Sequence, residues 1–229
     1  MRADAQAVQW RGGAGEERAV PGPPRHALDR FEPFGSTIFG QRAQAIRRHG
    51  EQTDFCWRLL TGCVRTVAWL GGGRRQIGEF LWPGALLGID DAGAHCFDME
   101  AVTDVALRRY PRCMIEAAAA SDPALALWLR TLTAGNLSRA RQHIFLLGRK
   151  TAMGKIAAFL LGLDRRSASA HGWFVELPMS RTDIADHLGL SIETVCRNLA
   201  HLEREGTVAI LRPGIELRDQ GALRRRACE

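Results

Sequence analysis

Residues 177–204, with the sequence LPMSRTDIADHLGLSIETVCRNLAHLER, decide the fold of the C-terminal part of the chain. Ser180 followed by Asp183 has the form of a capping box, which begins a helix, although Asp replaces the usual Glu. Gly189 stands where a helix ends in a left-handed residue, and Ser191 is a suitable cap for a second helix over the remaining residues. Two short helices joined by a turn that contains glycine predict a helix-turn-helix.

The second predicted helix, laid out at about 100° per residue, has one apolar and one polar side. The apolar side, which we expect to face the core, consists of Val195, Leu199 and Leu202. Glu193 and Arg197 lie one turn apart on the opposite side. Arg can donate two hydrogen bonds to guanine and Glu can accept one from the cytosine amino group, so this side predicts a DNA-reading surface. The alternative is a surface ion pair between the two, which is compatible with DNA binding because it orients Arg197.

Two short apolar segments after Gly206 flank the turn Arg212-Pro213-Gly214. They predict a β-hairpin, the wing of a winged helix. We expect Arg212 and the basic tail 224–226 to reach DNA phosphates. Residues 148–229 are therefore interpreted as a DNA-binding domain of the winged helix-turn-helix type. Its predicted DNA-contacting residues are Ser180, Ser191, Glu193, Thr194, Cys196, Arg197 and Arg212.

The N-terminal half of the chain has a different sequence pattern. Residues 1–30 are rich in Gly, Pro and charge without periodicity, which predicts a flexible tail. Residues 31–111 contain short apolar runs at 55–60, 64–70 and 75–82, separated by Gly-containing breaks. Short strands with frequent turn signals predict a β-roll or barrel, in which Gly71–Gly73 form a hairpin turn.

A long helix is predicted next, because Ser121-Asp122-Pro123 is a strong helix start and apolar residues follow at spacings of three and four. A helix over 122–147 would be roughly 39 Å long, more than a small domain needs, so residues 112–147 are interpreted as a hinge and a dimerisation helix. A long core helix within one chain is the alternative. The predicted dimer contacts are Leu125, Leu129, Leu132, Ile144 and Leu147.

The composition of the 229-residue chain, 46% hydrophobic and 24% charged, is that of a globular protein of one or two domains. The apolar runs are too short to span a membrane and the N-terminus has no apolar signal segment, so we expect a cytoplasmic location. The net charge of +6 permits a nucleic-acid partner. The six cysteines include no CxxC pair and are expected to be free thiols.

No motif points to an enzyme. Gly148–Lys155 superficially resembles a phosphate-binding P-loop, but five residues instead of four separate its glycines and Ile156 replaces Ser or Thr. The sequence contains no GxSxG, HExxH or paired CxxC motif. We therefore expect neither catalytic residues nor a metal site.

Several strings together carry a family resemblance: Gly73–Ile77, Pro83-Gly84 with Gly88, Leu147–Ala152, and Leu177–Ala185 running on to Arg197. Over residues 31–220 the chain resembles bacterial transcription regulators of the CRP/FNR superfamily, in particular the FixK-type branch. The resemblance implies an α+β fold with a jelly-roll-like N-terminal β-roll, a long dimerisation helix and a C-terminal winged helix-turn-helix. It also implies a homodimer that binds palindromic double-stranded DNA and contacts RNA polymerase.

The resemblance further suggests a half-site and no cofactor. Ile192 stands where cyclic-AMP receptors carry Arg, which favours TTGA-N6-TCAA-like palindromes. No cysteine precedes Cys56, so the N-terminal cysteine group of iron–sulfur relatives is missing. Residues 86–90 and 96–97 supply no Arg for a cyclic-nucleotide phosphate. FixK-type relatives imply activity without an effector, and a regulator gated by haem and NO or by a cyclic nucleotide is the alternative.

Cys196 occupies a position where relatives often carry Ser. One interpretation is that a small side chain simply fits against DNA. The other is a redox brake, because a thiol beside Arg197 near the start of a helix is expected to have some thiolate character, which would favour oxidation. An oxidised sulfur would place negative charge or bulk against the DNA.

Overall fold

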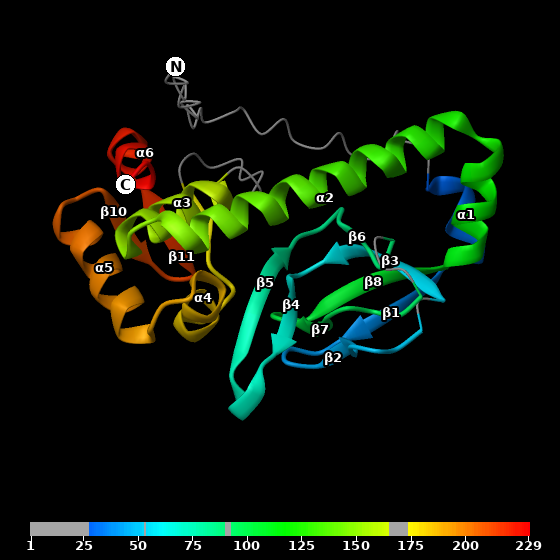
Figure 1. Ribbon diagram of the computed structural model, residues 1–229, viewed down its shortest axis with the longest axis horizontal. Helices are drawn as coiled ribbons and strands as arrows, with labels where there is room; N and C mark the ends of the chain where they lie inside the picture. The colour runs from blue at the N-terminus through cyan, green and yellow to red at the C-terminus, as the bar shows by residue number, and fades with distance from the viewer. Residues whose placement is uncertain (1–27, 53, 90–92, 165–173) are drawn as a thin grey trace, which may run out of the picture.

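The computed structural model describes residues 28–52, 54–89, 93–164 and 174–229. A β-roll lies beneath a long helix, α2 (Pro123–Arg149), which runs from one end of the molecule to a smaller helical unit at the other (Figure 1). None of the helices in these ranges combines the length and the hydropathy needed to cross a membrane.

The roll consists of two four-stranded antiparallel sheets, in the orders β1-β8-β3-β6 and β2-β7-β4-β5. A 3-10 helix, η1 (Asp29–Phe34), precedes it, and η2 (Gly71–Gly73) forms the hairpin turn between β4 and β5. The strands are β1 (Ser36–Gly40), β2 (Ala45–Arg47), β3 (Phe55–Thr61), β4 (Val64–Trp69), β5 (Arg75–Leu81), β6 (Leu86–Leu87), β7 (Asp98–Ala101) and β8 (Val105–Pro111). The predicted β-roll and the turn at Gly71–Gly73 are confirmed.

Apolar side chains that alternate along the strands form the core of the roll. Leu59 of β3 pairs with Leu107 of β8, and both side chains are fully buried together with Val64 and Met99. Strand residues two apart point to the same face, so one face of each sheet lines this core. Residues 1–27 of the predicted tail 1–30 lie outside the described residues, whereas Leu28 is buried and is not part of a flexible tail.

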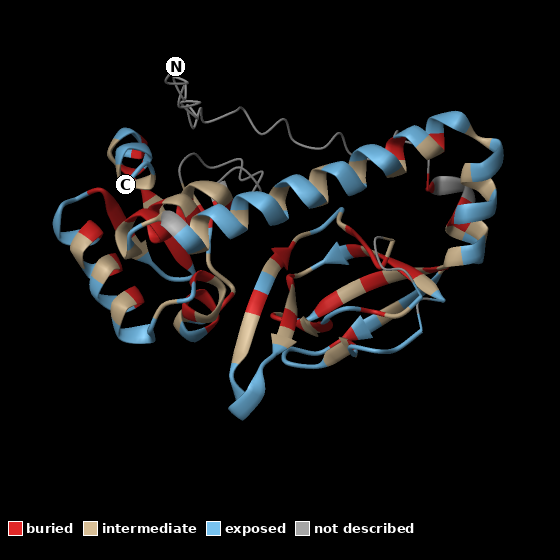
Figure 2. Ribbon diagram, viewed as in Figure 1, coloured by how far each residue is buried: buried red, intermediate tan, exposed pale blue. Residues whose placement is uncertain are grey.

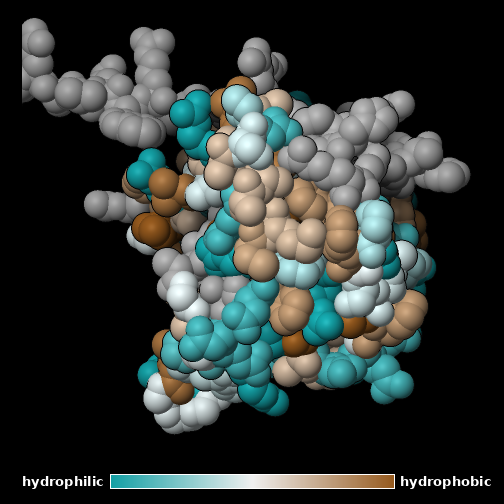
Figure 3. All heavy atoms as spheres, turned by 90° about the vertical axis from the view of Figure 1, so that its right-hand side faces the viewer, coloured by the Kyte–Doolittle hydropathy of each residue, from teal (hydrophilic) through white to brown (hydrophobic). Residues whose placement is uncertain are grey.

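Two helices follow the roll, α1 (Arg112–Ser121) and α2. The Asp122 side chain accepts hydrogen bonds from the backbone N–H groups of Ala124 and Leu125, at 2.9 and 3.1 Å, and Pro123 occupies the first turn. The predicted helix start is therefore confirmed, and the helix extends two residues beyond the predicted end. Figure 3 views the α1 end, where hydrophobic residues gather in the middle of a more hydrophilic surface.

The prediction that Leu125 contacts a partner is wrong. Its side chain is 1% exposed and packs in its own chain with Tyr110, Ile115 and Trp128. Leu129 and Leu132 are partly buried against the same cluster. The roll and α1 cover this side of α2, and the outer side of α2 is exposed over most of its length (Figure 2).

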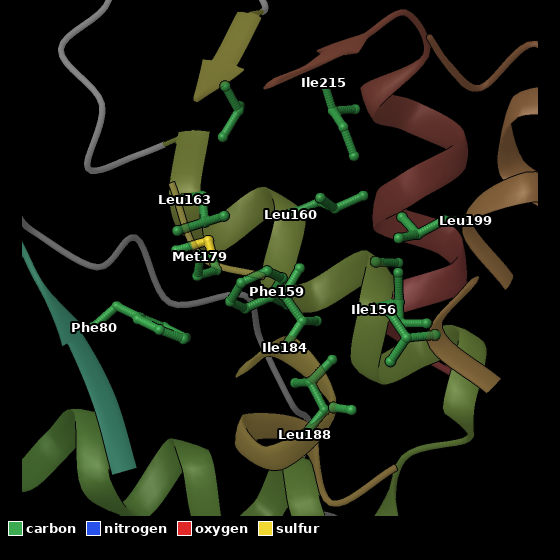
Figure 4. Close-up of a cluster of buried hydrophobic side chains, with 14 of the residues drawn as sticks. Phe80, Ile156, Phe159, Leu160, Leu163, Met179, Ile184, Leu188, Leu199 and Ile215 are labelled. Atoms are coloured by element: carbon green, nitrogen blue, oxygen red, sulfur yellow. The ribbon is translucent and has the colours of Figure 1, made fainter. Parts of the chain in front are cut away.

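The C-terminal unit contains α3 (Ala152–Asp164), β9 (Phe174–Glu176), α4 (Arg181–Leu188), α5 (Ile192–Arg204), β10 (Val208–Leu211), β11 (Gly214–Leu217) and α6 (Gln220–Ala227). Its strands form a sheet in the order β10-β11-β9. The core in Figure 4 joins Leu160 of α3, Ile184 of α4, Leu199 of α5 and Ile215 of β11. Phe80 from β5 of the roll belongs to the same cluster.

The basic segment 224–226, expected to be part of a tail, lies in helix α6. The Asp219 side chain caps this helix by accepting from the backbone N–H of Ala222 at 2.8 Å. The helix packs against α3, where a Cβ on Gly154 would lie 3.0 Å from the carbonyl oxygen of Arg226. Glycine at this position therefore permits the close approach of the two helices.

Candidate nucleic-acid interface

Helix α4 begins with the predicted capping box. The Ser180 hydroxyl accepts from the backbone N–H of Asp183 at 3.1 Å, and the Asp183 carboxylate accepts from the backbone N–H of Ser180 at 3.0 Å. The helix ends at Gly189, whose φ of 60° and ψ of 46° are left-handed. Both signals are local, so the sequence alone determines where this helix starts and stops.

The Ser191 side chain caps α5 by accepting from the backbone N–H of Thr194 at 3.2 Å, and the two hydroxyl oxygens lie 3.0 Å apart. The carbonyl of Thr194 accepts from the Asn198 side chain at 2.8 Å. Ser191 is exposed and Thr194 is half-buried. Both residues therefore stabilise the start of α5, and Ser191 is also exposed there.

The two sides of α5 are as predicted. Val195, Leu199 and Leu202 are buried, whereas Glu193 and Arg197 are exposed. Among the described residues no ion pair joins Glu193 to Arg197, so the surface-pair alternative is not formed in this structure. A hydrogen bond from the backbone N–H of Glu193, followed by one from Ser191, lowers the pKa of the Glu193 carboxyl. Glu193 is thus an ionised acceptor at neutral pH.

Cys196 is exposed beside Arg197, and Arg181 of α4 lies within electrostatic range of it. Burial lowers the pKa of the Arg181 guanidinium, and charge interactions with Cys196 and Glu203 act in the opposite direction. Sequence reasoning did not include Arg181 in the site. Its proximity to Cys196 depends on how α4 packs across α5, which no local pattern reveals.

The predicted wing is present. Strands β10 and β11 pair antiparallel, with Val208 opposite Leu217, and Arg212 is exposed between them. On α6, Arg224 and Arg225 are exposed. Arg226 instead forms an ion pair with Glu205 at 3.0 Å, so it is already partnered.

The predicted dimerisation residues do not form one face. Ile144 is 67% exposed and Leu147 is half-buried, whereas Leu125, as described above, is enclosed by its own chain. The large apolar side chains that α2 leaves exposed are Leu127, Leu137, Ile144 and Phe145.

A winged helix-turn-helix with an exposed acceptor and an exposed guanidinium in the first turns of its second helix defines a DNA-binding protein. Residues 154–226 match the Crp-like helix-turn-helix domain family. The chain is 41% identical to the nitrogen fixation regulation protein FixK of Azorhizobium caulinodans, over 94% of this chain and 86% of that protein. It is 32% identical to the transcriptional activator protein FnrL of Cereibacter sphaeroides, over 74% of this chain and 71% of that protein.

Solved structures of similar proteins support the same family assignment. FixK2 from Bradyrhizobium japonicum matches with a TM-score of 0.80 and 38% identity, covering 83% of this chain and 96% of that one. A CooA mutant from Carboxydothermus hydrogenoformans matches in fold, with a TM-score of 0.75 at 15% identity over 92% of this chain and 98% of that one. The chain belongs to the CRP/FNR family of transcription regulators, with FixK proteins among its relatives.

Proposed function

We propose that this regulator acts as a homodimer on TTGA-N6-TCAA-like palindromes, in the cytoplasm, where bacterial DNA lies. Arg197 donates to guanine O6 and N7, and the Glu193 carboxylate accepts from a cytosine amino group. Arg212 on the wing, with Ser180 and Ser191 at the helix starts, contacts phosphates. The observation that carries the proposal is the pair Glu193 and Arg197, exposed one turn apart on the side of α5 opposite its buried residues.

The proposed dimer forms along the exposed side of α2. Leu127, Leu137 and Ile144 follow one another by ten and seven residues, which places them on one side of a helix with a heptad period. Joining two chains there covers apolar side chains that one chain leaves in water. The dimer bound upstream of a promoter recruits RNA polymerase. In vitro transcription from templates with and without the palindrome measures this recruitment.

The DNA contacts are tested with Arg197→Ala in a fluorescence anisotropy titration of the palindrome. Loss of a bidentate guanine contact should cost about 1–3 kcal/mol per half-site. Arg42→Ala is the matched control, because Arg42 is an equally charged and exposed residue on the roll. Equal affinities of Arg197→Ala and the parent protein would falsify the assignment of Arg197.

Activity without an effector is a further part of the proposal. Purified protein should bind the palindrome tightly in air without added iron, haem or cyclic nucleotide. The support is the sequence pattern of the roll, in which the residues that hold such groups in relatives are replaced. A requirement for any of these groups, or a Soret band in the visible spectrum, would favour the effector-gated alternative.

Oxidation of Cys196 is the proposed brake. Peroxide oxidises the thiol to a sulfenic acid and is reduced to water, and further peroxide gives a sulfinate. The support is that Cys196 is exposed beside Arg197 and within electrostatic range of Arg181. Peroxide should abolish DNA binding by the parent protein and spare Cys196→Ser. If both proteins respond alike, Cys196 is only a small side chain at the DNA surface.

A further inference from the structure

Helix α4 is held by the roll as well as by its own domain. The guanidinium of Arg65 in β4 and that of Arg75 in β5 both donate to the same oxygen of Asp183, each at 2.6 Å. Arg75 also donates to Asp186 at 2.6 Å, and Arg65 to Glu100 of β7 at 2.7 and 2.9 Å. We name Arg65, Arg75, Asp183 and Asp186 the α4 clamp.

The clamp is largely shielded from water. The Asp183 side chain is 6% exposed, and those of Arg65 and Arg75 are 12% and 20% exposed. Burial alone would lower the pKa of Arg75, but hydrogen bonds and charge from Asp186 and Asp183 outweigh it, and the pKa is raised. Removing one member of such a group leaves a poorly solvated charge without its partner, so the arrangement strongly favours one geometry.

Further contacts extend the clamp into a continuous seam. The Gln76 side chain donates to the carbonyl oxygen of His187 at 3.2 Å, and the His187 Nδ1 lies 3.2 Å from the carbonyl oxygen of Ile77. The rings of Phe80 and His187 pack edge to face, with centroids 5.3 Å apart. On the other side of His187, the ring of His143 from α2 stacks at 4.3 Å.

The backbone alone does not fix the helix-turn-helix. Only Lys150 and Thr151 lie between α2 and α3, and the backbone of Lys150 is extended, with φ of −83° and ψ of 148°. A short extended joint permits rotation about its dihedral angles. The orientation of α4 and α5 relative to α2 therefore depends on contacts across the seam.

We propose that the α4 clamp is a positioning device that sets the half-site spacing the dimer accepts. This inference rests on the proposed palindrome binding by a homodimer. Two recognition helices linked through α2 must match two half-sites, whose separation mirrors the geometry of the protein. One added base pair moves a half-site by about 3.4 Å and about 34° around the DNA axis. With the clamp intact, the second α5 cannot reach the displaced half-site and affinity falls. With the clamp loosened, α4 and α5 can move and bind it.

The test uses the full chain and palindromic duplexes in which two inverted copies of the half-site are separated by five, six or seven base pairs, together with a duplex carrying one half-site. Arg75→Gln removes one hydrogen bond to Asp183 Oδ1 and one to Asp186, whereas the two capping-box hydrogen bonds of α4 use Asp183 Oδ2, the Asp183 backbone N–H and Ser180. Arg74→Gln is the matched control, since Arg74 is the neighbouring residue, carries the same charge and is exposed. Arg75→Lys keeps a cation between the two carboxylates.

The parent protein should prefer the six-base-pair spacing. In Arg75→Gln, affinity for that duplex should fall about tenfold and the preference over the other spacings should shrink by about the same factor. Affinity for the single half-site should stay within about twofold, because the reading surface of α5 is unchanged. Arg74→Gln and Arg75→Lys should behave like the parent protein.

Two results overturn the positioning role. One is an unchanged spacing preference in Arg75→Gln. The other is an equal loss on all duplexes, including the single half-site, which is the mark of a merely structural residue. If Arg75→Gln does not fold, as judged by circular dichroism, Asp186→Asn removes one contact of the same clamp and decides the question. If the parent protein shows no spacing preference, the palindrome proposal itself is refuted. If the parent protein prefers one spacing and Arg75→Gln prefers it equally, only the positioning role of the clamp is refuted.

Discussion

Truncating Ile144 to alanine should separate the dimer while leaving each chain folded. The change removes three carbon atoms, worth about 2.4 kcal/mol when fully buried, at about 0.8 kcal/mol each. Since Ile144 is 67% exposed in one chain, a dimer along this side of α2 gains about two-thirds of that amount per chain. The two copies together contribute about 3 kcal/mol, so the dimer dissociation constant should rise roughly 200-fold.

Sedimentation velocity over a range of protein concentrations measures this constant. Leu125→Ala is the informative comparison, because Leu125 is 1% exposed within its own chain. It should lower the free energy of unfolding by about 2–5 kcal/mol through the cavity it leaves in the cluster with Tyr110 and Trp128. A dimer constant that responds to Leu125→Ala in the folded protein and not to Ile144→Ala would refute the reasoning about which side of α2 is covered.

Three more predictions concern local features. Burial, then the charge of Lys155, lowers the pKa of His143. Protonation of His143 therefore favours the unfolded chain. The stability that neutral His143 contributes is present above the unfolded pKa of about 6.5 and is lost as the pH falls below it. Between pH 7 and pH 5, Tm should therefore fall less in His143→Phe than in the parent protein. Ser191→Ala should lower the free energy of unfolding by about 1 kcal/mol, measured by urea denaturation, because it removes the cap of α5. Gly189→Ala should cost about 1–2 kcal/mol in the same assay, whereas Gly189→Asn should cost less, since φ at this residue is 60°.

The helix-turn-helix could be predicted residue by residue, because its signals act over one or two turns of chain. Ser180 and Asp183 bond each other, Gly189 supplies its own left-handed conformation, and Ser191 caps the helix that it precedes. The buried side of α5 follows from helical periodicity alone. The same kind of local signal, Asp219, marks the start of α6, five residues before the basic segment 224–226.

The faces of α2 could not be assigned in this way. Leucines recur on more than one side of this helix, so periodicity does not distinguish the side covered by the roll from the side left to a partner. Leu125 and Leu127 are two residues apart, yet the first is 1% and the second 53% exposed. The difference arises from where η1, the roll and α1 lie against the helix.

The sequence by itself determined the helix-turn-helix, the ends of α4 and the exposed side of α5 that carries Glu193 and Arg197, because each depends on neighbours a few residues away. Only the tertiary structure decided which surfaces meet. Arg75 and Asp183 are 108 residues apart, and Arg65 and Asp183 are 118 apart. Charged residues at such separations have many conceivable partners along a chain with 31 basic and 25 acidic residues, and packing of the roll against α4 selects among them.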